Sequence, residues 1–162
     1  MLVLLAVSRM RLPLKGISAS ALAAVVACLA GGSVVHGSAF WMVESELRTV
    51  FVGATIEGQY VDGRTFTESY HASGSLIYRE AVRQVDWSGR WSVVEGRFCT
   101  IYDKFGTGGC FRVRQTSANC FEFYFDTRTE AEARRSTLRR PTWTARAWRT
   151  DQLSTCTDRP MV

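Results

Sequence analysis

The chain has 162 residues, of which 46% are hydrophobic and 22% are charged, so it belongs with globular proteins and not with disordered ones. The formal net charge is +5, but three of the 20 basic residues lie within the first 39 positions. The remainder then carries 17 basic and 15 acidic side chains, and a balance this close to neutral gives no reason to expect a nucleic-acid partner.

Residues 1–39 are expected to form an export signal. Three basic residues, Arg9, Arg11 and Lys15, precede an apolar, alanine-rich stretch over 17–35. Small residues then lead up to Ala39, after which we expect cleavage. The predicted protein is therefore periplasmic or secreted.

Two alternatives for this leader remain. The apolar stretch would serve as a membrane anchor if it were retained, although Gly31, Gly32 and His36 make it a poor membrane span. The sequence Val25-Val-Ala-Cys28 also resembles a bacterial lipoprotein box without its usual leucine. A lipid anchor through Cys28 is accordingly the second choice for localisation.

Residues 40–162 are expected to form a single disulfide-bonded β domain. An amphipathic helix is predicted over 44–51, with acidic residues in its first turn and Leu47, Val50 and Phe51 on its apolar face. Alternating or β-branched runs predict strands over 54–61, 65–70, 75–80 with an irregular continuation to Val85, 90–94, 97–102, 110–115 and 120–125, with Ser88-Gly89 as a turn. Such regularly spaced turn signals indicate a meander, sandwich or small barrel.

The strands over 97–102, 110–115 and 120–125 carry three of the five cysteines. A register with Phe98 opposite Phe111, Val113 opposite Phe121, Cys99 opposite Cys110 and Arg112 opposite Glu122 separates apolar from polar side chains. It buries Phe98, Phe111, Val113, Phe121, Phe123 and Phe125 on one face, and sends Cys99, Cys110, Arg112, Arg114, Cys120 and Glu122 to the other. The phenylalanine face is thus the predicted core.

Two disulfides are predicted. Directly opposed cysteines lie close enough to bridge, which favours a Cys99–Cys110 bond. If Cys28 leaves with the leader, four cysteines remain, and an even number in an exported domain argues for full pairing. The second bond is then Cys120–Cys156, which would tie the C-terminal tail to the sheet.

The last part of the chain is expected to contain a short helix and a closing strand. Thr129-Glu-Ala-Glu132 fits a capping box, so a helix is predicted over 130–139, ended by Pro141. The alternation over 142–149 predicts a final strand. The fold class is therefore mainly β: one antiparallel meander forming a strongly bent sheet or small barrel, with a short N-terminal helix and another before the last strand.

A resemblance adds to this interpretation. The residues that carry it are Leu47, Gly53-Ala-Thr, Gly58, Asp62-Gly63, Tyr70, Gly74, Gly89-Arg-Trp91, Cys99 and Cys110-Phe-Arg-Val113. They resemble small exported proteobacterial proteins grouped as a domain of unknown function, over roughly the middle half of the mature chain. The resemblance implies an exported β-meander with a cysteine pair and brings no known activity.

The function expected from these patterns is a non-catalytic envelope or secreted binding module. Its candidate surface for an anionic envelope component or protein partner consists of Arg135, Arg139, Arg140, Trp143, Arg146 and Trp148, within a run that also includes Arg134 and Arg149. The alternative interpretation without a binding function is a solvated face on which the aliphatic parts of the arginine side chains cover apolar surface.

The sequence is also consistent with two alternative functions. A lipocalin-like carrier would hold a small apolar ligand in a cavity lined by Phe98, Phe111, Phe121 or Phe123. A hydrolase would use His71 with Asp62 or Glu68 as the nearby carboxylate. No metal or cofactor is expected, because the predicted mature chain has one histidine, His71, and its cysteines lack a C-x-x-C spacing, which makes a poor ligand set.

Overall fold

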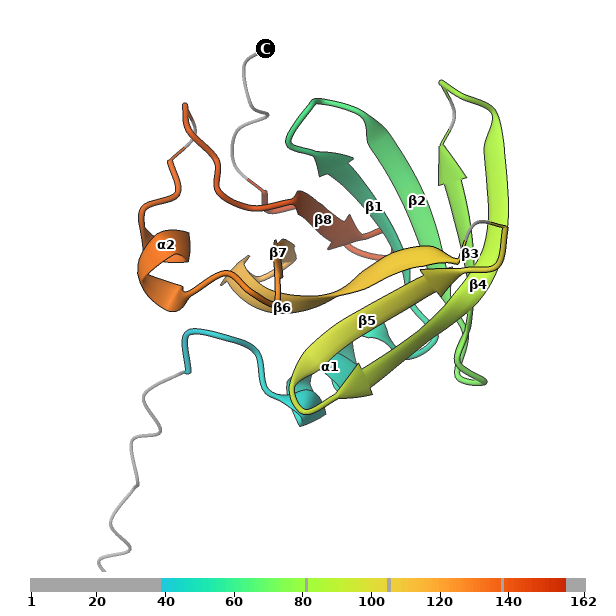
Figure 1. The fold of residues 1–162 in the computed structure, drawn as a ribbon, viewed down its shortest axis with the longest axis horizontal. Helices are drawn as coiled ribbons and strands as arrows, with labels where there is room; N and C mark the ends of the chain where they lie inside the picture. Colours follow the sequence, from blue (N-terminus) through green and yellow to red (C-terminus); the bar gives the residue numbers. More distant parts are fainter. Residues whose placement is uncertain (1–38, 81, 105, 138, 157–162) are drawn as a thin grey trace, which may run out of the picture. The chain divides into compact units, whose positions relative to one another are not determined.

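The computed structural model describes residues 39–156 except 81, 105 and 138, so the predicted leader and Cys28 lie outside the described residues. In order, the elements are α1 (Glu44–Phe51), β1 (Thr55–Tyr60), β2 (Thr65–Tyr70), β3 (Ser75–Glu80), β4 (Val85–Val94), β5 (Arg97–Tyr102), β6 (Thr107–Ser117), β7 (Cys120–Phe125), α2 (Glu130–Arg134) and β8 (Ala145–Arg149). The strands form a closed antiparallel barrel in sequence order, and β8 pairs with both β7 and β1 (Figure 1). The predicted fold class is confirmed.

The helix α1 closes one end of the barrel. Its apolar side chains Leu47 and Phe51 are completely buried, and the Phe51 ring lies 4.8 Å from the ring of Phe98 and 5.4 Å from that of Phe121. Burying one such side chain contributes about 1.5–3 kcal/mol. Because α1 directly precedes β1, it covers the end of the barrel at which β1 begins. The β2–β3, β4–β5 and β6–β7 turns lie at the same end.

The opposite end carries the β1–β2, β3–β4 and β5–β6 hairpins and the long β7–β8 connection that contains α2 (Figure 1). We call this end the mouth. Side chains at alternate strand positions fill the barrel between the mouth and α1, as the pleat requires. The buried cluster comprises Met42, Leu47, Phe51, Ile56, Phe66, Tyr70, Leu76, Tyr78, Trp91, Val93, Phe98, Val113, Phe121, Phe123, Ala145 and Ala147.

The predicted turn at Ser88-Gly89 is wrong, because both residues lie inside β4. The chain turns earlier, where Gln84 takes a φ of +50°. Gly89 serves a different purpose, since a Cβ atom added to it would lie 2.3 Å from the carbonyl oxygen of Ile101 on the neighbouring strand β5. The glycine permits a close approach of two strands instead of a reversal of the chain.

The predicted pairing of β5 with β6 is correct, and that of β6 with β7 is wrong by two residues. Phe98 pairs with Phe111 and Cys99 with Cys110. Val113 pairs with Phe123 instead of Phe121, and Arg114 replaces Arg112 opposite Glu122. Strand β6 continues to Ser117, which shortens the turn to Ala118 and Asn119 and shifts the register. A shift of two residues preserves the faces, so Val113, Phe121 and Phe123 are buried as predicted. The predicted burial of Phe125 is wrong, because this residue ends β7 and is 50% exposed.

Other element boundaries also differ from the prediction, including both ends of β1. Strand β6 begins at Thr107, helix α2 ends at Arg134, and β8 begins at Ala145. The predicted capping box is present, because Thr129 Oγ1 accepts a hydrogen bond from the Glu132 backbone N–H, and Glu132 bonds back to the Thr129 N–H. The helix is short because the chain then folds back, and the Thr142 hydroxyl donates to the carbonyl of Glu132.

The structure contains both predicted disulfides. Cys99–Cys110 links β5 to β6, and Cys120–Cys156 holds the C-terminal tail against β7. The buried amide of Asn119 strengthens the second attachment by donating to the carbonyls of Arg149, Gln152 and Leu153. The tail is therefore fixed by covalent and polar contacts together.

Candidate ligand-binding site

A carboxylate lies inside the barrel. Glu68 alternates with Phe66 and Tyr70 on the inward face of β2, and only 5% of Glu68 is exposed. The hydroxyl of Tyr70 donates a hydrogen bond to Oε2, and the hydroxyl of Tyr102 on β5 donates to Oε1. Within the described part of the chain, no arginine or lysine forms an ion pair with this carboxylate. Its charge is stabilised by neutral donors alone.

Burial dominates the acid–base properties of this cluster. It raises the pKa of the Glu68 carboxyl above its ordinary value, although the hydrogen bonds from Tyr102 and Tyr70 act in the opposite direction. Burial and the adjacent carboxylate also raise the pKa values of Tyr70 and Tyr102, so both phenols stay protonated and can donate at neutral pH.

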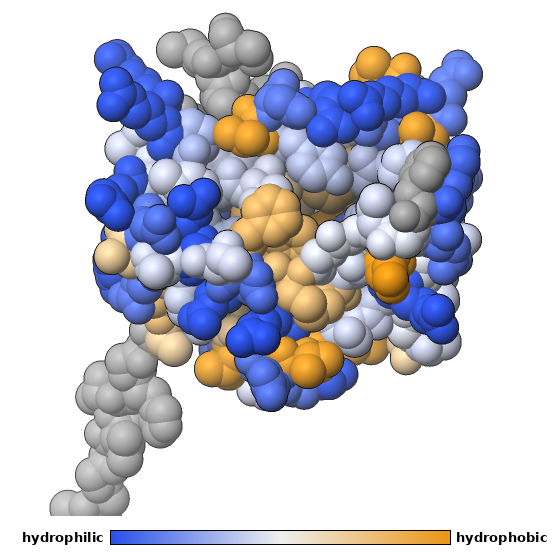
Figure 2. Space-filling model, viewed as in Figure 1, coloured by the Kyte–Doolittle hydropathy of each residue, from blue (hydrophilic) through white to orange (hydrophobic). Residues whose placement is uncertain are grey.

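A cavity of about 40 Å³ adjoins the buried carboxylate. It is lined by Ile56, Tyr60, Phe66, Glu68, Tyr70, Phe98, Thr100, Tyr102, Phe111, Phe123, Thr144 and Ala145. Tyr60, Tyr102 and Thr144 lie at or next to strand ends on the mouth side, which places the cavity between the packed core and the mouth. Figure 2 shows a recess with an apolar floor in the middle of one face, surrounded by hydrophilic side chains.

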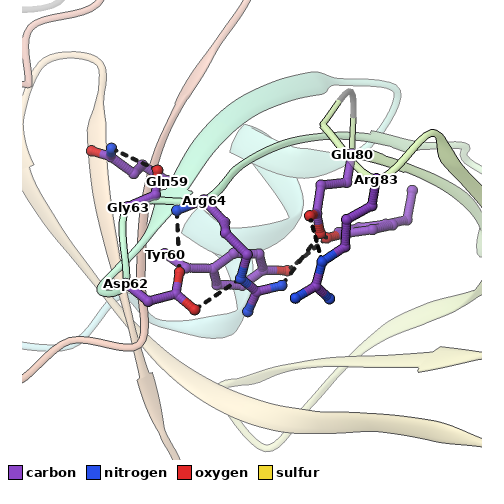
Figure 3. Close-up of polar contacts among 8 residues, drawn as sticks. Gln59, Tyr60, Asp62, Gly63, Arg64, Glu80 and Arg83 are labelled. Atoms are coloured by element: carbon purple, nitrogen blue, oxygen red, sulfur yellow. Dashed lines mark hydrogen bonds and ion pairs between the residues drawn. The ribbon is translucent and has the colours of Figure 1, made fainter.

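A second buried carboxylate lies at the mouth, and arginines compensate its charge. Arg64 Nη1 lies 3.3 Å from Oε2 of Glu80, while Arg64 Nε donates to Asp62 Oδ2 at 2.8 Å (Figure 3). Arg83 Nε lies 3.2 Å from Glu80 Oε1, a charge contact without hydrogen-bond geometry. Tyr78 donates to Glu80 Oε2 at 2.9 Å, and burial raises the pKa of Tyr78 to about 12.

The mouth network reaches the cavity through Tyr60. The Arg64 guanidinium lies 5.0 Å from the centre of the Tyr60 ring, and this ring lines the cavity. Figure 3 shows Arg64 extending from the β1–β2 hairpin between Asp62 and Glu80. Arg64 thus contacts a residue that lines the cavity.

The predicted arginine and tryptophan surface is divided in the structure. Arg135, Arg139 and Arg140 are exposed on the chain that follows α2, and none forms an ion pair with a residue that the structure describes. Trp143 is only 4% exposed and packs with Tyr124 and Ala133 in a small cluster outside the barrel.

The other two members of that predicted surface lie on β8. Arg146 packs 5.2 Å from the centre of the Trp143 ring, and its Nη2 forms a 2.7 Å ion pair with the buried Glu122. Trp148 is half-buried. Trp143 and Arg146 therefore contribute mainly to packing between the β7–β8 connection and the barrel, while the three exposed arginines lie apart from them.

The residues of the hydrolase hypothesis are not brought together. His71 lies exposed in the β2–β3 turn at the α1 end, whereas Asp62 belongs to the β1–β2 hairpin at the mouth. Glu68 is enclosed in the barrel. Among the described residues, the His71 side chain has no hydrogen-bond or ion-pair partner.

Sequence reasoning missed the interior cluster of Glu68, Tyr70 and Tyr102. The signal was present, because alternation that buries Phe66 on β2 also buries the residues two and four positions further on. A glutamate at an inward position of a predicted strand is a buried charge, and buried charges concentrate at functional sites. The contact with Tyr102 could not be predicted from the sequence, because the closure of the barrel brings β5 opposite β2.

Comparison of the chain with protein-family models, with curated protein sequences and with solved structures found no match. None of the described helices has the length and apolar character needed to cross a membrane. Over residues 39–156, with the three gaps noted above, no group of three or more histidine, cysteine, aspartate or glutamate side chains is placed to hold a metal ion.

Proposed function

We propose that this protein is an exported, non-catalytic binding module that takes a small ligand into its barrel through the mouth. The observation that carries the proposal is the cavity beside Glu68, in a barrel that α1 closes at the other end. Small closed barrels commonly hold one ligand in this position. The predicted leader and the two disulfides support export, because such bonds persist in oxidising compartments.

The size of the cavity limits the ligand. Pockets for drug-sized molecules measure roughly 300–1,000 Å³, whereas this cavity measures about 40 Å³. A water molecule needs about 10–15 Å³ on a comparable scale, so the space suits a group of a few non-hydrogen atoms. The lipocalin-like carrier function is thereby narrowed to a small ligand, or to the end group of a longer one that extends through the mouth.

The test uses exported protein purified after expression of the full chain with its leader. Protein-observed NMR would follow titrations with n-propylamine, n-propanol and acetate, which have equal numbers of non-hydrogen atoms and differ in charge. We expect at least one probe to shift resonances of the cavity-lining residues in a saturable way. If none of the three probes bound in a saturable way, the proposal would be overturned.

A matched variant locates the binding. Ala145 is buried on β8 and lines the cavity, so Ala145→Val would fill the space with a side chain that suits a strand. We expect this variant to keep the dispersed NMR spectrum of the barrel and to lose probe binding. Unchanged binding in Ala145→Val would place the ligand elsewhere and contradict the proposed site.

The exposed arginines favour a second candidate function, the attachment of the module to an anionic envelope component. Arg135, Arg139 and Arg140 place three exposed positive charges on one short connection, and none of them forms an ion pair within the described part of the chain. Each basic residue near an anionic lipid surface contributes about 1 kcal/mol. This candidate concerns attachment and is compatible with a ligand in the barrel.

Its test is co-sedimentation with vesicles that contain anionic lipid. Replacing Arg135, Arg139 and Arg140 by serine should abolish binding at low salt. The control replaces three arginines that are ion-paired in the structure, Arg79, Arg97 and Arg128, and removes the same net charge. If the two variants lost vesicle binding equally, net charge alone would explain the binding, and a specific surface would be refuted.

A further inference from the structure

The buried carboxylates of Glu68 and Glu80 differ in how their charges are compensated. Glu80 has two guanidinium groups within 3.3 Å, whereas the described residues give Glu68 only two tyrosine hydroxyls. Leaving an ionised carboxylate in an apolar interior without a cation is costly. A molecule that brings a positive charge into the adjoining cavity would remove this cost.

We propose that the cavity binds the protonated amino group of a small aliphatic amine, with Glu68 as its counter-ion. This inference rests on the proposed function and names its ligand class. A carboxylate has about four lone-pair positions, and the two tyrosine hydroxyls occupy two of them. Acceptor capacity therefore remains on Glu68 for N–H donors of an ammonium group.

The aromatic lining suits the same ligand. Rings of Tyr60, Phe66 and Phe98 line the cavity, and the faces of such rings attract cations within about 6 Å. Phe66 packs 4.6 Å from Tyr60 at the mouth side, and Phe98 lies towards α1. The alkyl part of the amine would point towards the mouth and contact Tyr60, Phe66 and the methyl of Ala145, while its charged end meets Glu68.

Other ligand classes fit less well. An anion would be repelled by Glu68 in a medium where charge interactions are strong. A metal ion lacks ligands, since among the described residues Glu68 is the only carboxylate that lines the cavity and the other polar side chains there are hydroxyls. A neutral alcohol can accept from or donate to the cluster, but it leaves the charge of Glu68 uncompensated.

The closing experiment compares the three NMR probes in the wild-type protein and in Glu68→Gln, which keeps the shape of the side chain and removes its charge. We expect n-propylamine to bind the wild-type protein at least tenfold more tightly than n-propanol, and acetate not to bind. In Glu68→Gln, amine affinity should fall at least tenfold while the affinity for n-propanol changes less than threefold.

The outcomes separate this inference from the proposed function. Binding of n-propanol or acetate that Ala145→Val abolishes, without preference for the amine, would leave the binding module standing and overturn the amine site. Amine binding that persists unchanged in Glu68→Gln would also overturn it. If Glu68→Gln fails to fold, the test is the affinity of the wild-type protein for n-propylamine relative to n-propanol. A preference for the amine of less than tenfold would contradict a charged counter-ion.

Discussion

The hydroxyl of Tyr102 on β5 donates a hydrogen bond to Oε1 of Glu68 on β2, although 34 residues separate the two in the sequence. Strands β2 and β5 are not neighbours in the barrel, so this bond crosses the interior. Together with the bond from Tyr70, it forms a polar cluster within the largely apolar core. The predictions below follow from this arrangement and from the packing that surrounds it.

The first prediction concerns pH. Because burial raises the pKa of Glu68 in the folded state, the folded protein binds this proton more tightly than the unfolded chain. The contribution of Glu68 to stability is then full below the ordinary pKa of 4.5 and is lost as the pH rises through the folded-state value. Tyr60, Tyr70 and Tyr102 face the carboxyl and remain neutral over this window.

The measurement is urea unfolding of the wild-type protein and of Glu68→Gln at several pH values from about 4 to 8. The difference in unfolding free energy, wild type minus variant, should fall as the pH rises. Groups with lowered pKa values, such as Asp62, cancel in this difference. A difference that rises with pH would show a carboxylate stabilised in its charged form, contrary to the account.

The second prediction separates two tyrosines that donate to buried carboxylates. Tyr102→Phe removes one of the two donors to Glu68 and should cost about 1–3 kcal/mol, since no cation compensates the carboxylate. Tyr124→Phe removes the donor to Glu122, which keeps its ion pair with Arg146, and should cost less. Chemical denaturation at pH 7 measures both. A larger loss in Tyr124→Phe would contradict the ranking.

The third prediction tests the close approach of β4 and β5. Gly89→Ala places a Cβ atom against the backbone oxygen of Ile101 and should destabilise the protein by about 2–4 kcal/mol. Gly109→Ala on β6 is the control, because its Cβ would make only ordinary contacts, the nearest at 3.5 Å. It should change stability by about 1 kcal/mol or less. Thermal unfolding compares them, and equal losses would refute the steric explanation.

The fourth prediction concerns the two disulfides. The Cys99–Cys110 bond joins residues 11 apart and the Cys120–Cys156 bond joins residues 36 apart. By the loop-entropy relation, replacing each pair with serine costs about 3 and about 4 kcal/mol respectively. Urea unfolding under non-reducing conditions measures the two losses. If removing Cys120–Cys156 cost less than removing Cys99–Cys110, the tail would owe its position mainly to the Asn119 hydrogen bonds.

Much of the fold could be predicted from local patterns. Alternation in β2, β5 and β7 placed these strands at their observed bounds, and the opposition of Cys99 with Cys110 followed from the same alternation. The predicted continuation of β3 to Val85 is wrong, because Val85 begins β4. What failed depended on three-dimensional packing. Glycine is typical of turns, so the sequence around Gly89 predicts one. Only the position of β5 shows that this glycine is needed for the close contact of two strands.

The candidate site was harder to predict for a related reason. The sequence draws attention to the cluster of arginines after α2, yet burial depends on how the β7–β8 connection packs, and this separates Trp143 from Arg139. Conversely, alternation on β2 places Glu68 on the same face as Phe66, but the enclosure of its charge depends on the closure of the barrel. Tertiary context, which local periodicity does not contain, decided both cases.

The central claim is that Glu68 is the counter-ion of a ligand in the barrel cavity. A crystal structure of the exported protein soaked with n-propylamine at neutral pH tests it most directly. We predict density for the amine in the cavity, with its nitrogen within hydrogen-bond distance of Glu68 Oε1 or Oε2 and its alkyl chain towards the mouth. A cavity that holds only water, or an amine bound elsewhere, would contradict the claim.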